Sequence, residues 1–401
     1  MASRWLDAGA REGVASRSGV ARETFCWPGA LRALALVPRV RDAKRITLFT
    51  GERSYRSSGA AQVLASILPA GTDLARIEAL PDGAPSAELR RTVSALRRRS
   101  SSIIVAIGGT RVLDQAKVLR VLAAQSAAPE AVIAGGVSPR RPGAPLVAVP
   151  TTPASGTEVT AFAGLSVEGT RAVLDHPLVR PEVALVDARL CASLPTPLLA
   201  QSGVQALSLA IDSLWSARAD ETSREHAAYA LRRVVAGLTV LASGGHLDAG
   251  GRVALVEASL HAGHAVDHTR TGLLHAVAAP LGKALGVSLG RALALVLPQA
   301  LRANGRYAAL PLTALHSPRT VALSLSYITE SLGATSAQDA AARLGRLLEA
   351  LNLPTRCERA VLDDATIAEV VDAINLARLR DNPVRLARPQ LVQLLERMRF
   401  A

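Results

Sequence analysis

The chain has 401 residues, an apolar fraction of 49% and a formal net charge of +13. This length exceeds a single core of ordinary size and predicts about two domains. No apolar run reaches the roughly 18 residues that a transmembrane helix needs, so we expect no membrane span. The basic N-terminus lacks the apolar core of a secretory signal. Residues 1–24 are predicted to form a flexible arm, and the protein is expected in the cytoplasm.

The cysteines and the positive charge limit the classes of partner. Cys26, Cys191 and Cys357 lie far apart without CxxC spacing, which excludes a disulfide framework and a cysteine zinc site. The charge is mostly Arg spread along the chain, which indicates either a compositional bias or an anionic partner. No aromatic residues interleave with the arginines as in a base-stacking surface. We therefore expect no specific nucleic-acid binding, and a polyanion binder is the weakest hypothesis.

The first half of the chain alternates strand-like and helix-like segments. Short apolar runs predict strands at Arg45–Thr50, Ser102–Ile107, Pro145–Pro150 and Val183–Asp187. Helical periodicity predicts helices at Ser57–Leu68, Ser86–Arg99 (with Ser86 as the N-cap) and Leu113–Gln125. The small residues, Pro and Gly of Ala127–Pro142 predict a surface loop. Fully apolar strands alternating with helices favour a parallel sheet covered on both faces.

The pattern changes near Leu190. From Pro195 onward the periodicity is helical almost throughout, with Gly and Pro between the segments. Helices are expected at 201–217, 224–242, 252–267, 273–285, 291–304, 319–332, 336–352 and 364–378. We therefore predict an α/β domain over residues 25–189, with a Rossmann-like parallel sheet, followed by an all-α domain over residues 190–401.

A glycine turn follows the second predicted strand. Gly108, Gly109 and Thr110 join that strand to a helix, with Asp114 in the first helical turn and Lys117 one turn further on. Free backbone N–H groups and the positive end of a helix attract phosphate, and glycine lets its oxygens approach closely. The turn is neither GxGxxG nor a P-loop, so alone it is a weak indication of a phosphate site.

Several motifs in order make the chain resemble the iron-containing alcohol dehydrogenase superfamily, which includes maleylacetate reductases and phosphonoacetaldehyde reductase-like enzymes. The family's GGGSxxDxAK is similar to Gly108–Lys117, its PTTxxTGSE to Pro150–Glu158, and its metal-binding helix and following turn to Gly272–Pro298. The resemblance covers residues 25 to 398. It implies an α/β domain like that of dehydroquinate synthase, an all-helical domain, and a cofactor lying across the N-terminal sheet.

The resemblance also implies the residues that bind the cofactor. At the pyrophosphate and in support of the turn these are Gly108, Gly109, Thr110, Asp114 and Lys117. On the adenosine and ribose side they are Thr151, Thr152 and Ser155. NAD-preferring members have an Asp after the early strand, where Gly51 stands here with Arg53 nearby. We therefore favour NADP over NAD, with a displaced carboxylate from Glu52 as the alternative.

The family's metal ligands, one Asp and three His, are mostly replaced in this chain. By resemblance, Gln205 stands at the Asp, Leu209 and Leu289 stand at two of the His, and only His275 is retained. A further family histidine near the nicotinamide is Ala279. Leucine cannot donate to a metal, and a neutral Gln is a poor ligand. We predict that no metal binds at the family position.

Histidines near residue 260 offer other chemistry, and by resemblance they line the cleft between the domains. One interpretation is an acid/base pair of His268 and His275 that replaces the metal in polarising a carbonyl group. A second is a relocated metal site that combines Asp267 with two of the histidines. In the third, His261, His264 and His268 are ordinary helix residues and only His275 acts in the cleft.

The resemblance implies an NAD(P)-dependent oxidoreductase that interconverts an alcohol and a carbonyl compound, here without a metal. Its substrate would be a small molecule or a peptide, and an anionic one would match the positive charge. A natural-product or peptide-modifying pathway is one setting, and we expect a homodimer. The alternative is a catalytically impaired dehydrogenase-like scaffold that serves a partner protein. Absence of NAD(P) binding, with co-purification of another enzyme, would favour that alternative.

Overall fold

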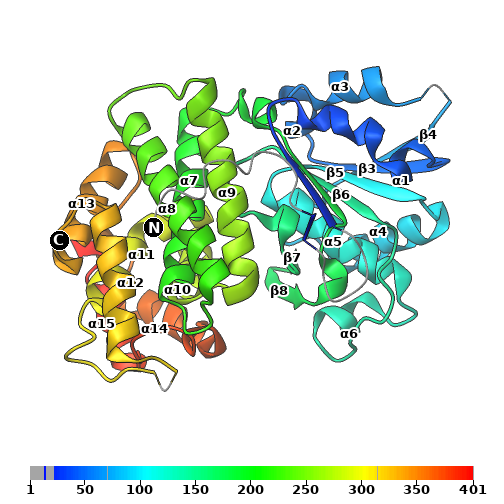
Figure 1. The fold of residues 1–401 in the computed structure, drawn as a ribbon. Coiled ribbons are helices and arrows are strands. Elements are labelled where there is room, and N and C mark those ends of the chain that lie inside the picture. The colour runs from blue at the N-terminus through cyan, green and yellow to red at the C-terminus, as the bar shows by residue number, and fades with distance from the viewer. Residues whose placement is uncertain (1–12, 15–21, 70, 314, 401) are drawn as a thin grey trace. The chain divides into compact units, whose positions relative to one another are not determined.

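The computed structural model describes residues 13–14, 22–69, 71–313 and 315–400. Backbone contacts divide the chain into an α/β unit, residues 1–152 with 156–194, and a helical unit, residues 153–155 with 195–401 (Figure 1). The arm predicted over residues 1–24 falls mostly outside the described residues. Its described parts are strand residues, because Gly13–Val14 forms β1 and Arg22–Cys26 forms β2.

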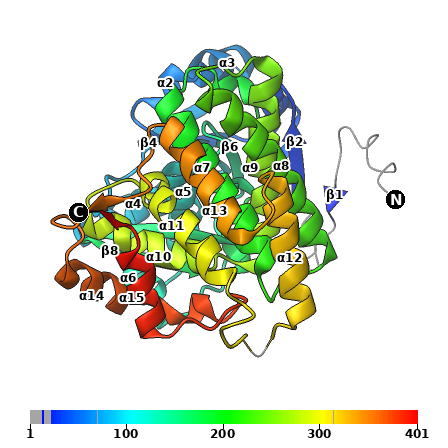
Figure 2. The ribbon, with the colours of Figure 1, turned by 90° about the vertical axis from the view of Figure 1, so that its left-hand side faces the viewer.

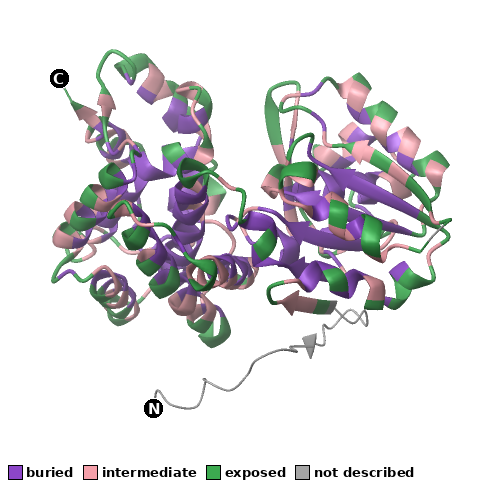
Figure 3. Ribbon diagram, turned by 90° about the horizontal axis from the view of Figure 1, so that it is seen from above, coloured by how far each residue is buried: buried purple, intermediate pink, exposed green. Residues whose placement is uncertain are grey.

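The α/β unit contains a sheet of seven strands among its described residues, in the order β1-β2-β9-β6-β5-β3-β4. Its neighbouring strands run parallel except for the pair β1 and β2. The remaining strands are β3 (Arg45–Thr50), β4 (Asp73–Glu78), β5 (Ile103–Gly108), β6 (Leu146–Pro150) and β9 (Val183–Val186). Every residue of β5, β6 and β9 is buried (Figure 3), as expected for central parallel strands. The predicted α/β fold is confirmed.

Two apolar clusters lie on the two faces of this sheet because side chains alternate along a strand. Ile104 and Ala106 of β5 join one cluster, together with the helices α4 (Ser86–Arg99) and α5 (Thr110–Ala124). Ile103, Val105 and Ile107 join the other, with the 3-10 helix η1 (Ala30–Leu36) and the helix α3 (Ala60–Ile67). The sheet is therefore covered on both faces, and α5 is fixed directly behind the glycine turn.

Some local predictions for the α/β unit are wrong in detail. The helix predicted over 57–68 is present as α3 but begins later, because Gly59 adopts φ 80 and is its N-cap; the short helix α2 (Ser54–Ser57) before it was not predicted. Ser86 is not an N-cap; Pro85 holds that position and Ser86 begins the helix. The loop predicted over 127–142 contains the short helix α6 (Pro129–Ile133). Edge strand β4 and the hairpin of β7 (Phe162–Val167) and β8 (Thr170–Asp175) were not predicted.

The helical unit follows the predicted periodicity, with some helices longer and others shorter than predicted (Figure 2). They are α7 (Thr196–Trp215), α8 (Glu221–Ala242), α9 (Ala249–Thr269), α10 (Leu273–Ala284), α11 (Leu289–Asn304), α12 (Pro318–Ser331), α13 (Ala337–Ala350), α14 (Asp364–Asp372) and α15 (Arg388–Glu396). Two features were missed, α15 and a parallel pair of short strands, β10 (Cys357–Glu358) and β11 (Arg399–Phe400). Among the described residues, no helix is long and apolar enough to cross a bilayer.

Candidate functional site

The glycine turn joins β5 to α5 and leaves the N-terminus of that helix open. Gly109 is the N-cap, and no described side chain accepts a hydrogen bond there. A Cβ at Gly108 would lie 2.6 Å from the side chain of Val112, and one at Gly109 would lie 3.2 Å from Thr152 Oγ1. Only glycine fits the first position without displacing its neighbour. The uncapped N–H groups and the bare backbone suit a bound phosphate.

Thr151 and Thr152 lie beside this turn because β6 pairs with β5. The N–H of Thr151 donates to the carbonyl of Gly108 at 2.9 Å. The hydroxyl of Thr151 is buried without a hydrogen-bond partner among the described residues. Such an orphaned group is costly, by about 1–3 kcal/mol, unless a ligand satisfies it. The turn and this hydroxyl therefore fit the phosphate and ribose groups of a nicotinamide dinucleotide. Ser155 belongs to the short stretch 153–155 that groups with the helical unit.

Asp114 and Lys117 reach from α5 to the segment that follows the threonines. Lys117 is fully buried, and its ammonium donates to the carbonyl and hydroxyl of Thr157 at 2.8 and 2.9 Å. Asp114 accepts from the hydroxyl of Thr157 and, at 2.9 Å, from the N–H of Gly164. These contacts fasten the segment against α5. These partners lie in that segment, and support of the glycine turn by the two charged residues stays a prediction.

The end of β3 carries the residues expected at the ribose. Gly51 follows the strand directly, and a Cβ there would lie 2.6 Å from Ser54 Oγ, so an acidic residue would require Ser54 to move. Arg53 is exposed and is the N-cap residue of α2. Sequence reasoning missed Arg76 on neighbouring β4, whose guanidinium donates to Thr50 Oγ1 at 2.8 Å and to the carbonyl of Gly51 at 3.4 Å. The pairing of β3 with β4 brings this cation to the position of the family's carboxylate.

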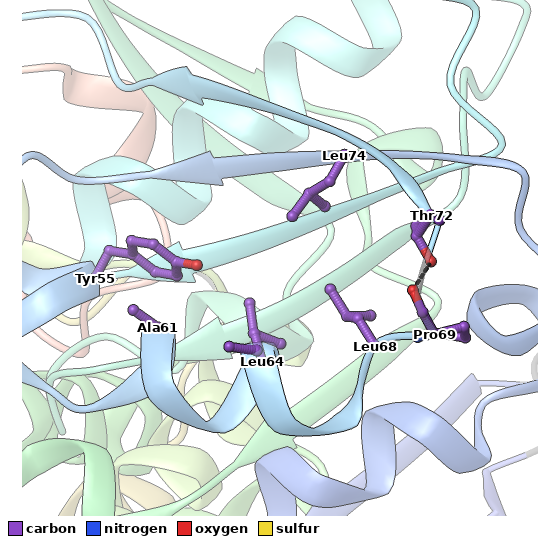
Figure 4. Close-up of a pocket in the computed structure, with 9 residues that line it drawn as sticks. Tyr55, Ala61, Leu64, Leu68, Pro69, Thr72 and Leu74 are labelled. Atoms are coloured by element: carbon purple, nitrogen blue, oxygen red, sulfur yellow. Dashed lines mark hydrogen bonds between the residues drawn. The ribbon is translucent and has the colours of Figure 1, made fainter.

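Two further groups surround Arg76. Its Cζ lies 5.2 Å from the centre of the Tyr55 ring, and its Nη2 lies 2.8 Å from a carboxylate oxygen of Glu78. An apolar hollow of about 190 Å³ extends from Tyr55 between α3 and β4, past Leu64 and Leu74 (Figure 4). The Thr72 hydroxyl at its rim donates to the carbonyl of Pro69 at 2.8 Å. With that hydroxyl engaged, the hollow has little to orient a polar ligand.

The family's metal position does not fit a metal in this chain. Gln205 and Leu209 lie on α7, Leu289 begins α11, and His275 lies in the first turn of α10. Leu209 is 3% exposed and packs as a core residue. One imidazole and one neutral amide fall short of the three or four donors that hold zinc or iron in proteins. No group of three or more His, Cys, Asp or Glu side chains in the described parts of the chain could hold a metal ion.

His275 is instead bound to Asp212 of α7, a residue that sequence reasoning missed. Asp212 is 1% exposed, and its carboxylate lies 3.2 Å from Nδ1 of His275. It also accepts from the N–H groups of Gly272 and Leu274 at 3.0 and 3.2 Å, and from the indole N–H of Trp215 at 3.3 Å. The carboxylate therefore caps α10 and matches the positive end of its helix dipole. Asp212 lies one helical turn after Leu209, so helical periodicity could have placed it on the same face of α7 as the family's ligand position.

The contact with Asp212 fixes the tautomer of His275. A carboxylate only accepts, so Nδ1 carries the proton of this hydrogen bond and Nε2 is the nitrogen left for exchange. No residue in the described ranges makes a hydrogen bond with Nε2. The imidazole is 8% exposed and held by a buried anion, as in a general acid/base dyad.

His268, the other predicted catalytic residue, has a different partner. Its Nδ1 lies 3.0 Å from the carboxylate of Asp220, and both side chains are about half exposed. Asp220 is the N-cap of α8 and forms a capping box with Ser223. Burial acts to raise the pKa of Asp220, but hydrogen bonds from Ser223 and His268 lower it to about 2. His268 thus pairs with a helix cap, and no contact with His275 is found among the described residues.

Three other histidines form a cluster on the seam between α8 and α9. Nδ1 of His226 lies 2.7 Å from Nδ1 of His261, and the ring of His264 stacks on His226 with the centroids 5.0 Å apart. The ring of Tyr229 lies 4.2 Å from that of His261. Asp267 pairs with Arg270 instead. The relocated metal site considered from the sequence is therefore wrong for the described residues, which hold no metal-binding group of three.

Comparisons with known proteins agree with this architecture. A family model described as iron-containing alcohol dehydrogenase matches residues 21–188, and one for the C-terminal part of the Fe-containing alcohol dehydrogenase family matches residues 199–399. A phosphonoacetaldehyde reductase of Streptomyces viridochromogenes is 33% identical over 77% of this chain and 78% of its own length. A probable alcohol dehydrogenase of Escherichia coli is 29% identical over 70% and 71% of the two chains.

Solved structures share the fold at lower identity. A sulfoacetaldehyde reductase from Bifidobacterium kashiwanohense, crystallised with NAD+, has a TM-score of 0.81 and 22% identity, covering 94% of this chain and 96% of its own. A 1,3-propanediol oxidoreductase also gives a TM-score of 0.81, with 23% identity over 94% and 97% of the two chains. At these identities the likeness establishes the fold alone.

Proposed function

The chain belongs to the iron-containing alcohol dehydrogenase family, and we propose that it is an NAD(P)-dependent alcohol/carbonyl oxidoreductase that works without the family's metal. One observation carries this proposal. Three of the four ligand positions hold side chains that bind metal poorly or not at all, while the fourth, His275, is held by the buried carboxylate of Asp212. The cofactor cradle, in contrast, keeps its open helix end and its orphaned threonine hydroxyl.

The bound nicotinamide would supply the hydride chemistry, and the residues of this chain would supply position and a proton. In the direction of reduction, Nε2 of a protonated His275 donates a proton to the oxygen that becomes the alcohol. In oxidation the same nitrogen removes that proton. Asp212 holds the ring through Nδ1 and balances the charge of the imidazolium.

Metal analysis of the active protein tests this function. We expect substoichiometric iron and zinc, and turnover of NADPH with aldehydes that a chelator leaves unchanged. Stoichiometric metal whose removal abolishes turnover would refute the metal-free mechanism. Cofactor binding without turnover of any carbonyl compound would instead support the scaffold alternative.

For the cofactor we propose a preference for NADP. Gly51, at the end of β3, supplies no carboxylate to the ribose. The guanidinium of Arg76 contacts the carbonyl of Gly51, and Arg53 follows Gly51 by two residues. A guanidinium at this place suits a 2′-phosphate. Glu78 opposes the preference, since its carboxylate already contacts Arg76 and could accept from ribose hydroxyls.

Two substitutions with opposite expected effects test the preference. Arg76→Ala should lower kcat/KM for NADPH by about tenfold or more and leave that for NADH nearly unchanged, because a charged hydrogen bond is worth about 1.5–3 kcal/mol. Glu78→Gln should raise the ratio of NADPH to NADH use. Equal losses with both cofactors in Arg76→Ala would contradict the assignment.

For the substrate we propose a small carbonyl compound or alcohol that carries an anionic group. The net charge of +13 favours anionic partners. Two similar proteins are named for phosphonoacetaldehyde and sulfoacetaldehyde, each an aldehyde bearing an acid group. Turnover rates with a panel of anionic and neutral aldehydes would test this substrate class. We further propose a biosynthetic setting in the cytoplasm.

A further inference from the structure

The turn between α9 and α10, residues 270–272, has a backbone that its sequence does not favour. Arg270 adopts φ 63 and ψ 171. Ser100 also has a positive φ, but its ψ of 54 places it in the ordinary left-handed helical region. The conformation of Arg270 is one that only glycine enters readily. A long charged side chain therefore stands at a position suited to glycine.

Contacts with α7 hold this turn on both sides of Arg270. The N–H of Arg270 donates to the carbonyl of Val266 at 2.7 Å, and its carbonyl accepts from the hydroxyl of Thr269 at 3.2 Å. Thr269 is in turn 2.9 Å from Ser213 Oγ, while Gly272 donates to Asp212. The strained backbone is thus anchored to the same stretch of α7 that holds His275.

The side chain of Arg270 is secured but still accessible. Its guanidinium donates to the backbone carbonyl of Asp267 and lies 3.7 Å from the Asp267 carboxylate. Arg270 has 27% of its side chain exposed, against 7% for Asp267. A guanidinium has five N–H donors in a planar fork, so it can contact an oxyanion as well as the groups that already hold it.

We propose that Arg270 binds the anionic group of the substrate, a carboxylate or a phosphonate, while the carbonyl group meets His275. This inference rests on the proposed function, in which Nε2 of His275 exchanges the proton. Arg270 lies five positions before His275 in a turn that shares its anchor, Asp212. Backbone strain that surrounding contacts keep in place is characteristic of ligand-binding positions. The matching substrate is a short aldehyde with its anion a few atoms from the carbonyl.

Steady-state kinetics with two aldehydes of equal chain length tests the proposal. Succinic semialdehyde carries a carboxylate where butanal carries a methyl group. Arg270→Gly should lower kcat/KM for succinic semialdehyde at least tenfold and leave that for butanal within about twofold. Arg270→Lys should retain part of the preference because it keeps the charge. An unchanged ratio of the two aldehydes in Arg270→Gly would overturn the proposal.

Thermal unfolding distinguishes the effect of the Arg270 charge from the effect of its backbone strain. Arg270→Gly and Arg270→Ala both lose the contact with Asp267 and should both lose the substrate preference. Only glycine relaxes the turn, so Arg270→Gly should have a Tm about 2 °C or more above that of Arg270→Ala. Ser100→Gly is the matched control: it relieves the strain of a positive φ in the α/β unit and should not change the aldehyde ratio. A change of the ratio in Ser100→Gly equal to that in Arg270→Gly would contradict a role for the Arg270 charge.

Binding of unreactive anions makes the test independent of turnover. Succinate and methylphosphonate should raise the Tm of the parent protein at constant ionic strength, and Arg270→Gly should abolish the shift. If no aldehyde is reduced but this shift is found, the proposed function fails and the anion site stands. If aldehydes are reduced with no shift and no preference, the function stands and the anion site fails. Absence of both turnover and shift would refute both.

Discussion

The glycine turn in the α/β unit and the ligand position in the helical unit derive from motifs of one family, but the first depends on backbone groups and the second on side-chain donors. The turn carries two departures, Thr110 and Arg111, but the helix N-terminus is still uncapped among the described residues. Arg111 donates to the carbonyl of Leu80 at 3.0 Å and so stabilises the local fold. A phosphate site made of backbone N–H groups survives such changes, since the donors belong to the chain itself.

The ligand position depends on side-chain donors, and each substitution removes one outright. What remains is a polar pair in an apolar helical core: Asp212 with 1% exposure and His275 with 8%. A buried carboxylate is tolerated only when its oxygens are satisfied, and here three other N–H groups donate to it besides the imidazole. A site made of backbone groups therefore tolerates substitution better than one made of side-chain donors.

The largest expected effect comes from the helical unit. His275→Gln should lower kcat by about 10²–10⁴-fold, the usual contribution of a positioned acid or base, with the cofactor affinity unchanged. The measurement is kcat for aldehyde reduction together with a fluorescence titration of NADPH. A loss of kcat with unchanged NADPH affinity would show that His275 acts in catalysis and that the glycine turn binds the cofactor independently of it.

His268→Gln is the control, since His268 pairs with Asp220 at the cap of α8. It should change kcat by less than about threefold, because half-exposed pairs of this kind contribute little. An equal loss of kcat in both variants would restore the predicted acid/base pair. Loss of NADPH binding in His275→Gln would contradict the independence of the cofactor site from the His275 position.

The sequence predicted the sheet well where the strands are continuous apolar runs, as in β5, because burial on both faces leaves a plain pattern. It missed edge strand β4, where exposed and half-buried residues mix. It also missed Asp212 and Arg76. Their roles depend on which backbone N–H groups and which neighbouring strand end they meet, and spacing along the chain does not carry that information.

A second prediction concerns the backbone of the cradle. Gly108→Ala places a Cβ 2.6 Å from the side chain of Val112, so we expect a loss of about 1–3 kcal/mol in stability and roughly tenfold or more in NADPH affinity. Denaturant unfolding and NADPH titration measure the two effects. Gly345→Ala in α13 is the control: its Cβ meets nothing within 4 Å, and it should gain up to about 1 kcal/mol. Unaltered NADPH binding in Gly108→Ala would show that the phosphate lies elsewhere.

The smallest expected effect is an opposite pH dependence of the two units. Burial raises the pKa of Glu158, in the α/β unit, to about 7. Burial, with His226 and Arg233, lowers the pKa of His261, in the helical unit, to about 4. Between pH 4.5 and 7 the folded chain keeps the Glu158 proton that the unfolded chain releases, so stability falls as pH rises. Between pH 6.5 and 4, His261 binds a proton in the unfolded chain but stays neutral in the folded chain, so stability falls as pH drops.

From pH 5 to pH 7 each contribution changes by about 2 kcal/mol, at roughly 1.4 kcal/mol per pKa unit, and the two changes have opposite signs. Glu158→Gln should therefore gain stability relative to the parent on going from pH 5 to pH 7, and His261→Gln should lose it. Denaturant unfolding of the three proteins at both pH values measures the difference. A change in the same direction in both variants would contradict a raised pKa of Glu158 together with a lowered pKa of His261. Opposite changes would confirm that each unit buries a group in its neutral form, an acid in one and a base in the other.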